Sequence, residues 1–152
     1  MTPRADQSVP VSDSAARASL AWAVKPSFWS YVLDAGGSIT AVGSAEIVGA
    51  EVRFPTVAPP AAGGATNRRS FVGGVIFDAH HGALRAAVFD PALEESSTGT
   101  TLTARLGIHD VERVALADID PRTLSATLRL EGAMLFDFRY APGTELAPVR
   151  LV

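Results

Sequence analysis

The sequence predicts a mainly β (α+β) fold, an antiparallel β-sandwich or barrel-like domain with one short helix near its N-terminus. Short β-branched and aromatic runs recur at a spacing of roughly 8 to 12 residues, which is typical of such folds. Turns rich in Gly, Pro and Asn separate these runs. A single segment, residues 26–35, has apolar residues at helical spacing.

The composition is that of a folded protein with one hydrophobic core. The 152 residues are 47% hydrophobic and 19% charged. A net charge of −3 with scattered arginines gives no reason to expect nucleic acid as a partner. The absence of cysteine excludes disulfides, thiolate metal sites and cysteine nucleophiles. No run of 18 apolar residues occurs, so we expect no membrane span.

The N-terminal part predicts a strand followed by the helix. Residues 1–17 are polar and rich in Ser, Ala and Pro, and we expect a flexible lead-in. "SLAWAV", residues 19–24, predicts a strand, and Pro26 suits the first turn of a helix. Gly36-Gly37 supplies the backbone freedom to end that helix. We expect residues 18–152 to form a single domain.

The rest of the chain predicts strands and turns. Residues 123–140 are expected to form a hairpin about Glu131-Gly132, with alternate residues 124, 126, 128 and 130 on one face of its first strand. The remaining expectations are strands within 38–49 and 51–57, a loop at 58–69, two strands around a turn at 79–82, a polar turn at 94–101, strands at 101–108 and 114–119, and a turn at 118–122.

No motif nominates an enzyme. Ser27, His80 and Asp34 would make a Ser–His–Asp set, but no G-x-S-x-G elbow marks the serine. The three histidines, His80, His81 and His109, have no metal-ligand spacing. We therefore expect a binding protein and not an enzyme.

Tyr31 is the residue with the most specific chemistry. A phenol on a helix, with an imidazole delivered by a distant turn, could bind ferric iron, because phenolate is a hard anionic oxygen ligand. The alternative is an ordinary core aromatic residue whose hydroxyl has a hydrogen-bond partner. From these residues alone the core interpretation is favoured.

Three segments, in order, resemble the HtaA domain of haem-acquisition proteins of actinobacteria such as corynebacteria. They are residues 20–32, 73–91 and 136–149, and together they span nearly the whole expected fold. The positions that match are Trp22, Lys25, Ser27, Phe28 and Tyr31 in the first segment, Phe77, His80, Gly82, Leu84, Asp90 and Pro91 in the second, and Phe138, Tyr140, Gly143, Thr144, Leu146 and Pro148 in the third. Ala23, Ala79 and Ala147 stand where the family usually has Gly, Gly and Asp.

The resemblance implies a site for ferric haem b. Tyr31 would be the axial ligand to the haem iron, and His80 would hydrogen-bond the phenol, or His81 if the turn is shifted by one residue. Ser27 would bond a haem propionate from near the helix N-terminus. Phe28 and Phe77, with Val32, are haem-facing candidates, and Arg68 and Arg69 could meet propionates from their loop.

The resemblance also implies haem uptake, transfer or storage, with another haem-binding protein or a transporter component as donor or acceptor. A homodimer is a further possibility. The alternative is a non-catalytic β-sandwich interaction module that keeps the family fold without haem. The family is usually secreted or held at the cell surface, whereas residues 1–17 lack the apolar core of a signal peptide. That conflict favours either an intracellular relative or a domain excised from a longer protein.

Overall fold

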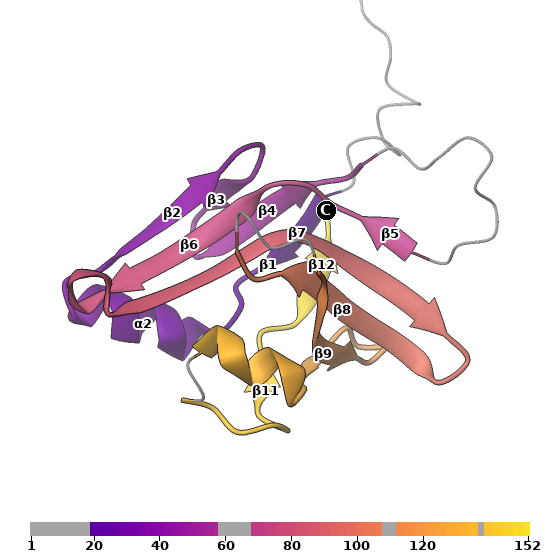
Figure 1. Cartoon of the computed structure of the whole chain (residues 1–152). Coiled ribbons are helices and arrows are strands. Elements are labelled where there is room, and N and C mark those ends of the chain that lie inside the picture. The colour runs from indigo at the N-terminus through magenta and orange to yellow at the C-terminus, as the bar shows by residue number, and fades with distance from the viewer. Residues whose placement is uncertain (1–18, 58–67, 108–111, 137–138) are drawn as a thin grey trace, which may run out of the picture.

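The computed structural model confirms the mainly β fold class. It describes residues 19–57, 68–107, 112–136 and 139–152. Figure 1 shows two sheets, one of which curls into a half-barrel, with the short α-helix (indigo) and a 3-10 helix (orange) below them. The elements are β1 (Ser19–Trp22), α2 (Pro26–Asp34), β2 (Ser38–Val42), β3 (Glu46–Val48), β4 (Glu51–Pro55), β5 (Arg68–Ser70), β6 (Gly74–Ala79), the 3-10 turn η1 (His80–Gly82), β7 (Leu84–Ser96), β8 (Gly99–Arg105), β9 (Val114–Ile119), β10 (Ala126–Leu128), the 3-10 helix η2 (Glu131–Phe136), β11 (Glu145–Leu146) and β12 (Val149–Leu151).

Both sheets are antiparallel. The smaller sheet has the order β12-β1-β4-β3, so the last described strand lies at its edge and pairs with the first. The larger sheet follows the path β11-β10-β9-β8-β7-β6-β2, and β5 pairs with β7 off this path. Since β6 and β7 are joined by η1, the hairpin tip lies at one end of the larger sheet, beside α2 (Figure 1).

A bend in β7 lets one sheet curl. The backbone of Asp90 is left-handed (φ 51°), and the pairing of β7 with β8 shifts register there. The carboxylate of Asp90 accepts a hydrogen bond from the Gly73 amide at 3.0 Å and pairs with Arg105. Arg113 donates to the Asp90 carbonyl oxygen, and partial burial lowers the pKa of its guanidinium. These contacts hold the bend from three neighbouring segments.

Aromatic side chains from both sheets and the helix meet in one core. Trp22, Phe28, Phe54, Phe77 and Phe136 are all fully buried. The buried indole of Trp22 still donates a hydrogen bond, to the Ala147 carbonyl oxygen at 2.7 Å. The helix is thus fixed to the sheets by its apolar face.

The helix, the turn at residues 79–82 and the turn after β9 are confirmed. In the last of these, the Asp120 carboxylate accepts hydrogen bonds from the amides of Arg122 and Thr123, which lowers the pKa of Asp120. The first strand ends earlier than expected, at Trp22, because Val24 adopts a left-handed conformation (φ 63°). The polar turn expected at 94–101 is shorter, since β7 runs to Ser96 and β8 begins at Gly99.

The expected hairpin at residues 123–140 is wrong. Among the described residues of this segment only Ala126–Leu128 forms a strand, and it pairs with β9 and β11. Leu124 is left-handed (φ 64°) and Leu130 is 67% exposed, so residues 124 to 130 do not form one buried strand face. The segment Glu131–Phe136 is a 3-10 helix that buries Ala133, Leu135 and Phe136. A short apolar run does not by itself distinguish a strand from a buried helical turn.

Several expectations lie outside the described residues: the lead-in at 1–17, most of the loop at 58–69, and the positions of His109 and Phe138. Arg68 and Arg69, expected in that loop, are instead in β5. Among the helices that the structure describes, none has the length and apolar character needed to cross a membrane.

Candidate functional site

The helix α2 presents Tyr31 at the surface. Pro26 occupies its first turn after an extended Lys25, and no side chain caps this end. Phe28 and Val32 form the buried face, and Tyr31, which lies at the edge of that face next to Phe28, is only partly buried. Ser27 lies one turn before Tyr31 and therefore on the same side of the helix.

The β6–β7 turn brings an imidazole to Tyr31. His80, His81 and Gly82 are all left-handed, with φ of 55°, 56° and 89°. Two consecutive non-glycine residues in this region are strained, by about 1 to 2 kcal/mol each. The turn places His80 Nε2 2.8 Å from Tyr31 Oη, with the ring centroids 5.7 Å apart.

Gly37 permits this approach of helix and turn. A Cβ atom at Gly37 would lie 2.1 Å from the carbonyl oxygen of Asp78 and 2.9 Å from that of Val32. No side chain fits there, so the chain after α2 lies directly against the end of β6. The close packing sets the distance between Tyr31 and His80.

Arg139 is the second partner of the Tyr31 phenol. Its Nη2 donates a hydrogen bond to Tyr31 Oη at 2.7 Å, and its guanidinium carbon lies 3.9 Å from the ring centroid. A guanidinium only donates, so the Tyr31 oxygen accepts this bond. If the phenol is neutral, its own proton is then free to be donated to His80 Nε2.

Two further hydroxyls meet beside the helix N-terminus. Ser27 Oγ is 3.1 Å from Tyr140 Oη. Lys25 Nζ lies 5.1 Å from the Tyr140 ring centroid and donates to the Glu145 carbonyl oxygen at 3.1 Å. Lys25 is the sole lysine of the chain. The sequence interpretation matched Tyr140 to the family without assigning it a role, and it did not identify Arg139.

Phe28 and Phe77 do not reach the surface. Both are fully buried, with ring centroids 5.1 Å apart, and Phe28 also packs edge-on against Phe136 at 5.0 Å. Val32 is buried as well. In this structure the three expected haem-facing residues therefore pack in the core between α2 and β6, and they present no area to a ligand.

His81 is exposed and follows His80 in the turn. Tyr31 is hydrogen-bonded to His80 and not to His81. His81 lines a hollow of about 180 Å³ together with His80, Asp78 and residues 35–38. Within the described residues, no group of three or more His, Asp or Glu side chains is arranged to hold a metal ion.

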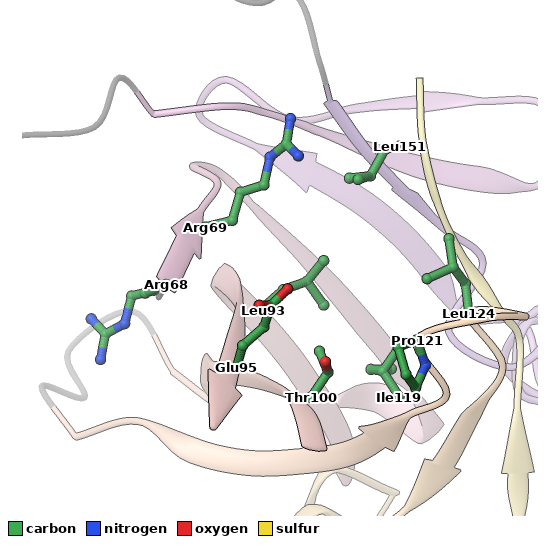
Figure 2. Close-up of a pocket in the computed structure, with 9 residues that line it drawn as sticks. All are labelled: Arg68, Arg69, Leu93, Glu95, Thr100, Ile119, Pro121, Leu124 and Leu151. Carbon is green, nitrogen blue, oxygen red and sulfur yellow. The ribbon is translucent and has the colours of Figure 1, made fainter. Parts of the chain in front are cut away.

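A larger cavity, of about 340 Å³, lies at the other end of β7. Figure 2 shows Arg68 and Arg69 on one side of it, with Ile119 and Leu124 across the opening. Arg68 forms an ion pair with Glu94 at 3.1 Å. Glu94 lies ten residues from Leu84, the end of β7 next to η1, which is about 30 Å along the strand. This placement contradicts the expectation that the two arginines meet haem propionates near Tyr31.

The family model for HtaA, described as "Htaa", matches residues 17–152. The chain belongs to the HtaA family. The resemblance expected from the sequence is therefore confirmed. A comparison with curated proteins finds no match.

Solved structures of HtaA and HtaB share the fold of this HtaA-family domain. The N-terminal domain of HtaA from Corynebacterium glutamicum has a TM-score of 0.70 at 23% identity, over 88% of this chain and 94% of that one. The haem-binding protein HtaB from the same organism has a TM-score of 0.63 at 17% identity, over 88% and 90%. A domain-swapped dimer of a variant of the C-terminal domain of HtaA, also from that organism, has a TM-score of 0.54 at 16% identity, over 100% and 99%.

The side chains of this HtaA-family domain fit ferric haem. The Tyr31 oxygen is a hard ligand atom at the surface, and His80 lies within reach to take its proton. The hydroxyls of Ser27 and Tyr140 and the ammonium of Lys25 are donors suited to carboxylates, and they gather one helical turn away.

Proposed function

We propose that this domain binds ferric haem b through the phenolate oxygen of Tyr31 and serves haem uptake, transfer or storage. The observation that carries the proposal is the 2.8 Å contact between Tyr31 Oη and His80 Nε2. It joins a surface phenol on α2 to an imidazole held by a strained turn 49 residues away. A phenol that served only the core would not need such a partner at the surface.

The chain's own residues handle the proton. Tyr31 must lose its phenol proton to ligate iron, and a free phenol keeps that proton at neutral pH. Ferric haem, when bound, supplies a Lewis acid that favours the anionic oxygen. His80 Nε2 accepts the proton and then donates a hydrogen bond back to the phenolate. His81 is the exposed neighbour that leaves this role to His80.

Ser27, Tyr140 and Lys25 orient the haem by its propionates. Their hydroxyls and ammonium lie at the N-terminal end of α2, where the helix dipole also favours anions. The similarity of the fold to that of the haem-binding protein HtaB supports a haem ligand. We propose carriage and not catalysis, with a second haem-binding protein or a transporter component as donor or acceptor.

A hemin titration tests the proposal. Adding hemin to the apoprotein should produce a shifted Soret band that saturates at one haem per chain, and Tyr31→Phe should lose most of the affinity. Tyr140→Phe is the matched control, since it removes the other tyrosine hydroxyl of the chain. It should lose only part of the affinity, because a propionate keeps Ser27 as a partner.

The titration also separates haem carriage from the second candidate, an interaction module that has the family fold but does not bind haem. No change in the Soret band at any hemin concentration would favour that module. Tyr31→Phe binding as tightly as wild type would show that the iron ligand is another residue.

Homodimerisation is a further proposal, since a relative's domain crystallised as a domain-swapped dimer. Size-exclusion chromatography of the apoprotein and of the hemin complex would detect it. A monomer in both forms would contradict it.

A further inference from the structure

We propose that Arg139 is a positioning residue for the ligand oxygen, a second hydrogen-bond donor that favours the anionic, iron-bound form of Tyr31. The inference rests on the proposed function, and it names a residue that the sequence interpretation did not identify. Arg139 follows η2 and lies 108 residues from Tyr31 in sequence.

Two contacts place the guanidinium. Its Nη2 is 2.7 Å from Tyr31 Oη, and its carbon is 3.9 Å from the centre of the Tyr31 ring. The first is a hydrogen bond and the second a cation–π contact over one ring face. Together these two contacts hold the guanidinium against the phenol. His80, from a different segment of the chain, bonds the same oxygen at 2.8 Å. The ligand oxygen thus has one titratable partner and one permanent cation.

The Arg139 bond strengthens as negative charge gathers on the oxygen. An arginine stays charged at every pH of interest, and a charge-assisted bond to an anionic acceptor is stronger than one to a neutral hydroxyl. The oxygen is least negative in the free phenol and more negative in the ferric complex. It is more negative again in the ferrous complex, where the iron withdraws less charge. Arg139 therefore favours the haem-bound over the free protein, and the ferrous over the ferric complex.

The test is to measure hemin affinity and the Fe(III)/Fe(II) midpoint potential in Arg139→Met, Arg139→Lys and Arg122→Met. Arg139→Met should raise the hemin Kd by roughly 10- to 100-fold and lower the midpoint potential. Arg139→Lys should restore part of both, because it keeps the charge without the planar fork. Arg122→Met is the control: it removes the same charge from the turn after β9, whose neighbouring residue Pro121 lines the cavity of Figure 2, and it should change neither quantity.

Each result decides the inference. Unchanged hemin binding by Arg139→Met would overturn it and show that Arg139 does not contribute to haem binding. Tighter binding would overturn it too, and would show that Arg139 blocks the site. Weaker binding with an unchanged potential would also overturn it, since Arg139 would then act on the haem periphery and not on the ligand oxygen. Arg139 is exposed, so Arg139→Met should unfold at the wild-type temperature.

The inference and the proposed function fail in different ways. If Tyr31→Phe loses haem while Arg139→Met behaves as wild type, only the role of Arg139 is lost. If wild type does not bind hemin, or Tyr31→Phe binds it as wild type does, both are wrong.

Discussion

At the scale of single residues, the site is a phenol whose oxygen already has two partners. Arg139 donates to it at 2.7 Å and His80 lies at 2.8 Å. Since Arg139 cannot accept, a neutral phenol has His80 as the acceptor for its proton, and the proposed iron ligation would send the proton there. The hydrogen bonds of the free protein would therefore also serve the proposed haem complex.

His80→Ala should weaken hemin binding by about tenfold, less than Tyr31→Phe does. The variant loses one hydrogen bond to the phenolate and the nearest proton acceptor, but it keeps the ligand atom and Arg139. The measurement is a hemin titration followed by absorbance.

His81→Ala is the matched control for this prediction, because it removes the adjacent exposed imidazole of the same turn. Its hemin affinity should equal that of wild type. If His81→Ala loses more affinity than His80→Ala, the assignment of the two histidines is reversed.

The resemblance of the sequence to the family implies roles for Tyr31, Ser27 and His80, and these stay predictions, but it implies none for Arg139. Its contact with Tyr31 spans 108 residues and depends on the segment after η2. The sequence predicts that segment as the second strand of a hairpin. The alternation of apolar and polar residues along such a strand does not indicate which residues lie near Tyr31. Phe28 and Phe77 were expected to face haem because buried and ligand-facing aromatics look alike in sequence.

At the scale of elements, the site depends on how α2 meets the β6–β7 hairpin. Neither element alone brings Tyr31 and His80 together. Gly37 joins them, because the chain after the helix touches the backbone of Asp78 where any side chain would collide.

Gly37→Ala should destabilise the fold by about 1 to 3 kcal/mol and weaken hemin binding. The new Cβ would lie 2.1 Å from a backbone oxygen, so the helix and the hairpin tip must move apart. Urea denaturation and a hemin titration measure the two effects.

Gly49→Ala is the control for Gly37→Ala. Its backbone is left-handed (φ 62°) but the space around it is open, so it should cost about 1 kcal/mol through strain alone. Its hemin affinity should be unchanged. Equal losses of hemin affinity in the two variants would show that general destabilisation, and not the helix–hairpin distance, is responsible.

The strands and their turns were largely predictable because short β-branched runs and turn residues are local signals. The pairing of β1 with β12 and the curl of the larger sheet were not. The first joins the two ends of the described chain, and the second depends on the Asp90 bend and its contacts with Gly73, Arg105 and Arg113. Such long-range contacts leave no periodic pattern in the sequence.

At the scale of the whole molecule, haem binding should stabilise the fold. A ligand that binds only the folded state adds about 2.7 kcal/mol when its free concentration is 100 times its Kd. For a chain of about 150 residues this raises the melting temperature by roughly 5 to 10 °C. Differential scanning calorimetry of the apoprotein and the hemin complex measures the shift. Tyr31→Phe should lose most of it.

The core beneath the site should be needed for stability and not for ligand chemistry. Phe28→Ala removes a fully buried ring that touches Phe77 and Phe136, and should cost about 3 to 5 kcal/mol. Urea denaturation measures this cost. Phe28→Leu keeps most of the volume and should bind hemin nearly as wild type. A large loss of affinity in a stable Phe28→Leu protein would instead place Phe28 against the haem.

The central claim is that the Tyr31 phenolate ligates the iron. Its most direct test is the electron paramagnetic resonance spectrum of the ferric haem complex, recorded for wild type and Tyr31→Phe. The account predicts a high-spin ferric signal of a tyrosinate complex in wild type and its loss in Tyr31→Phe. A low-spin signal typical of histidine ligation, or a wild-type spectrum in Tyr31→Phe, would contradict it.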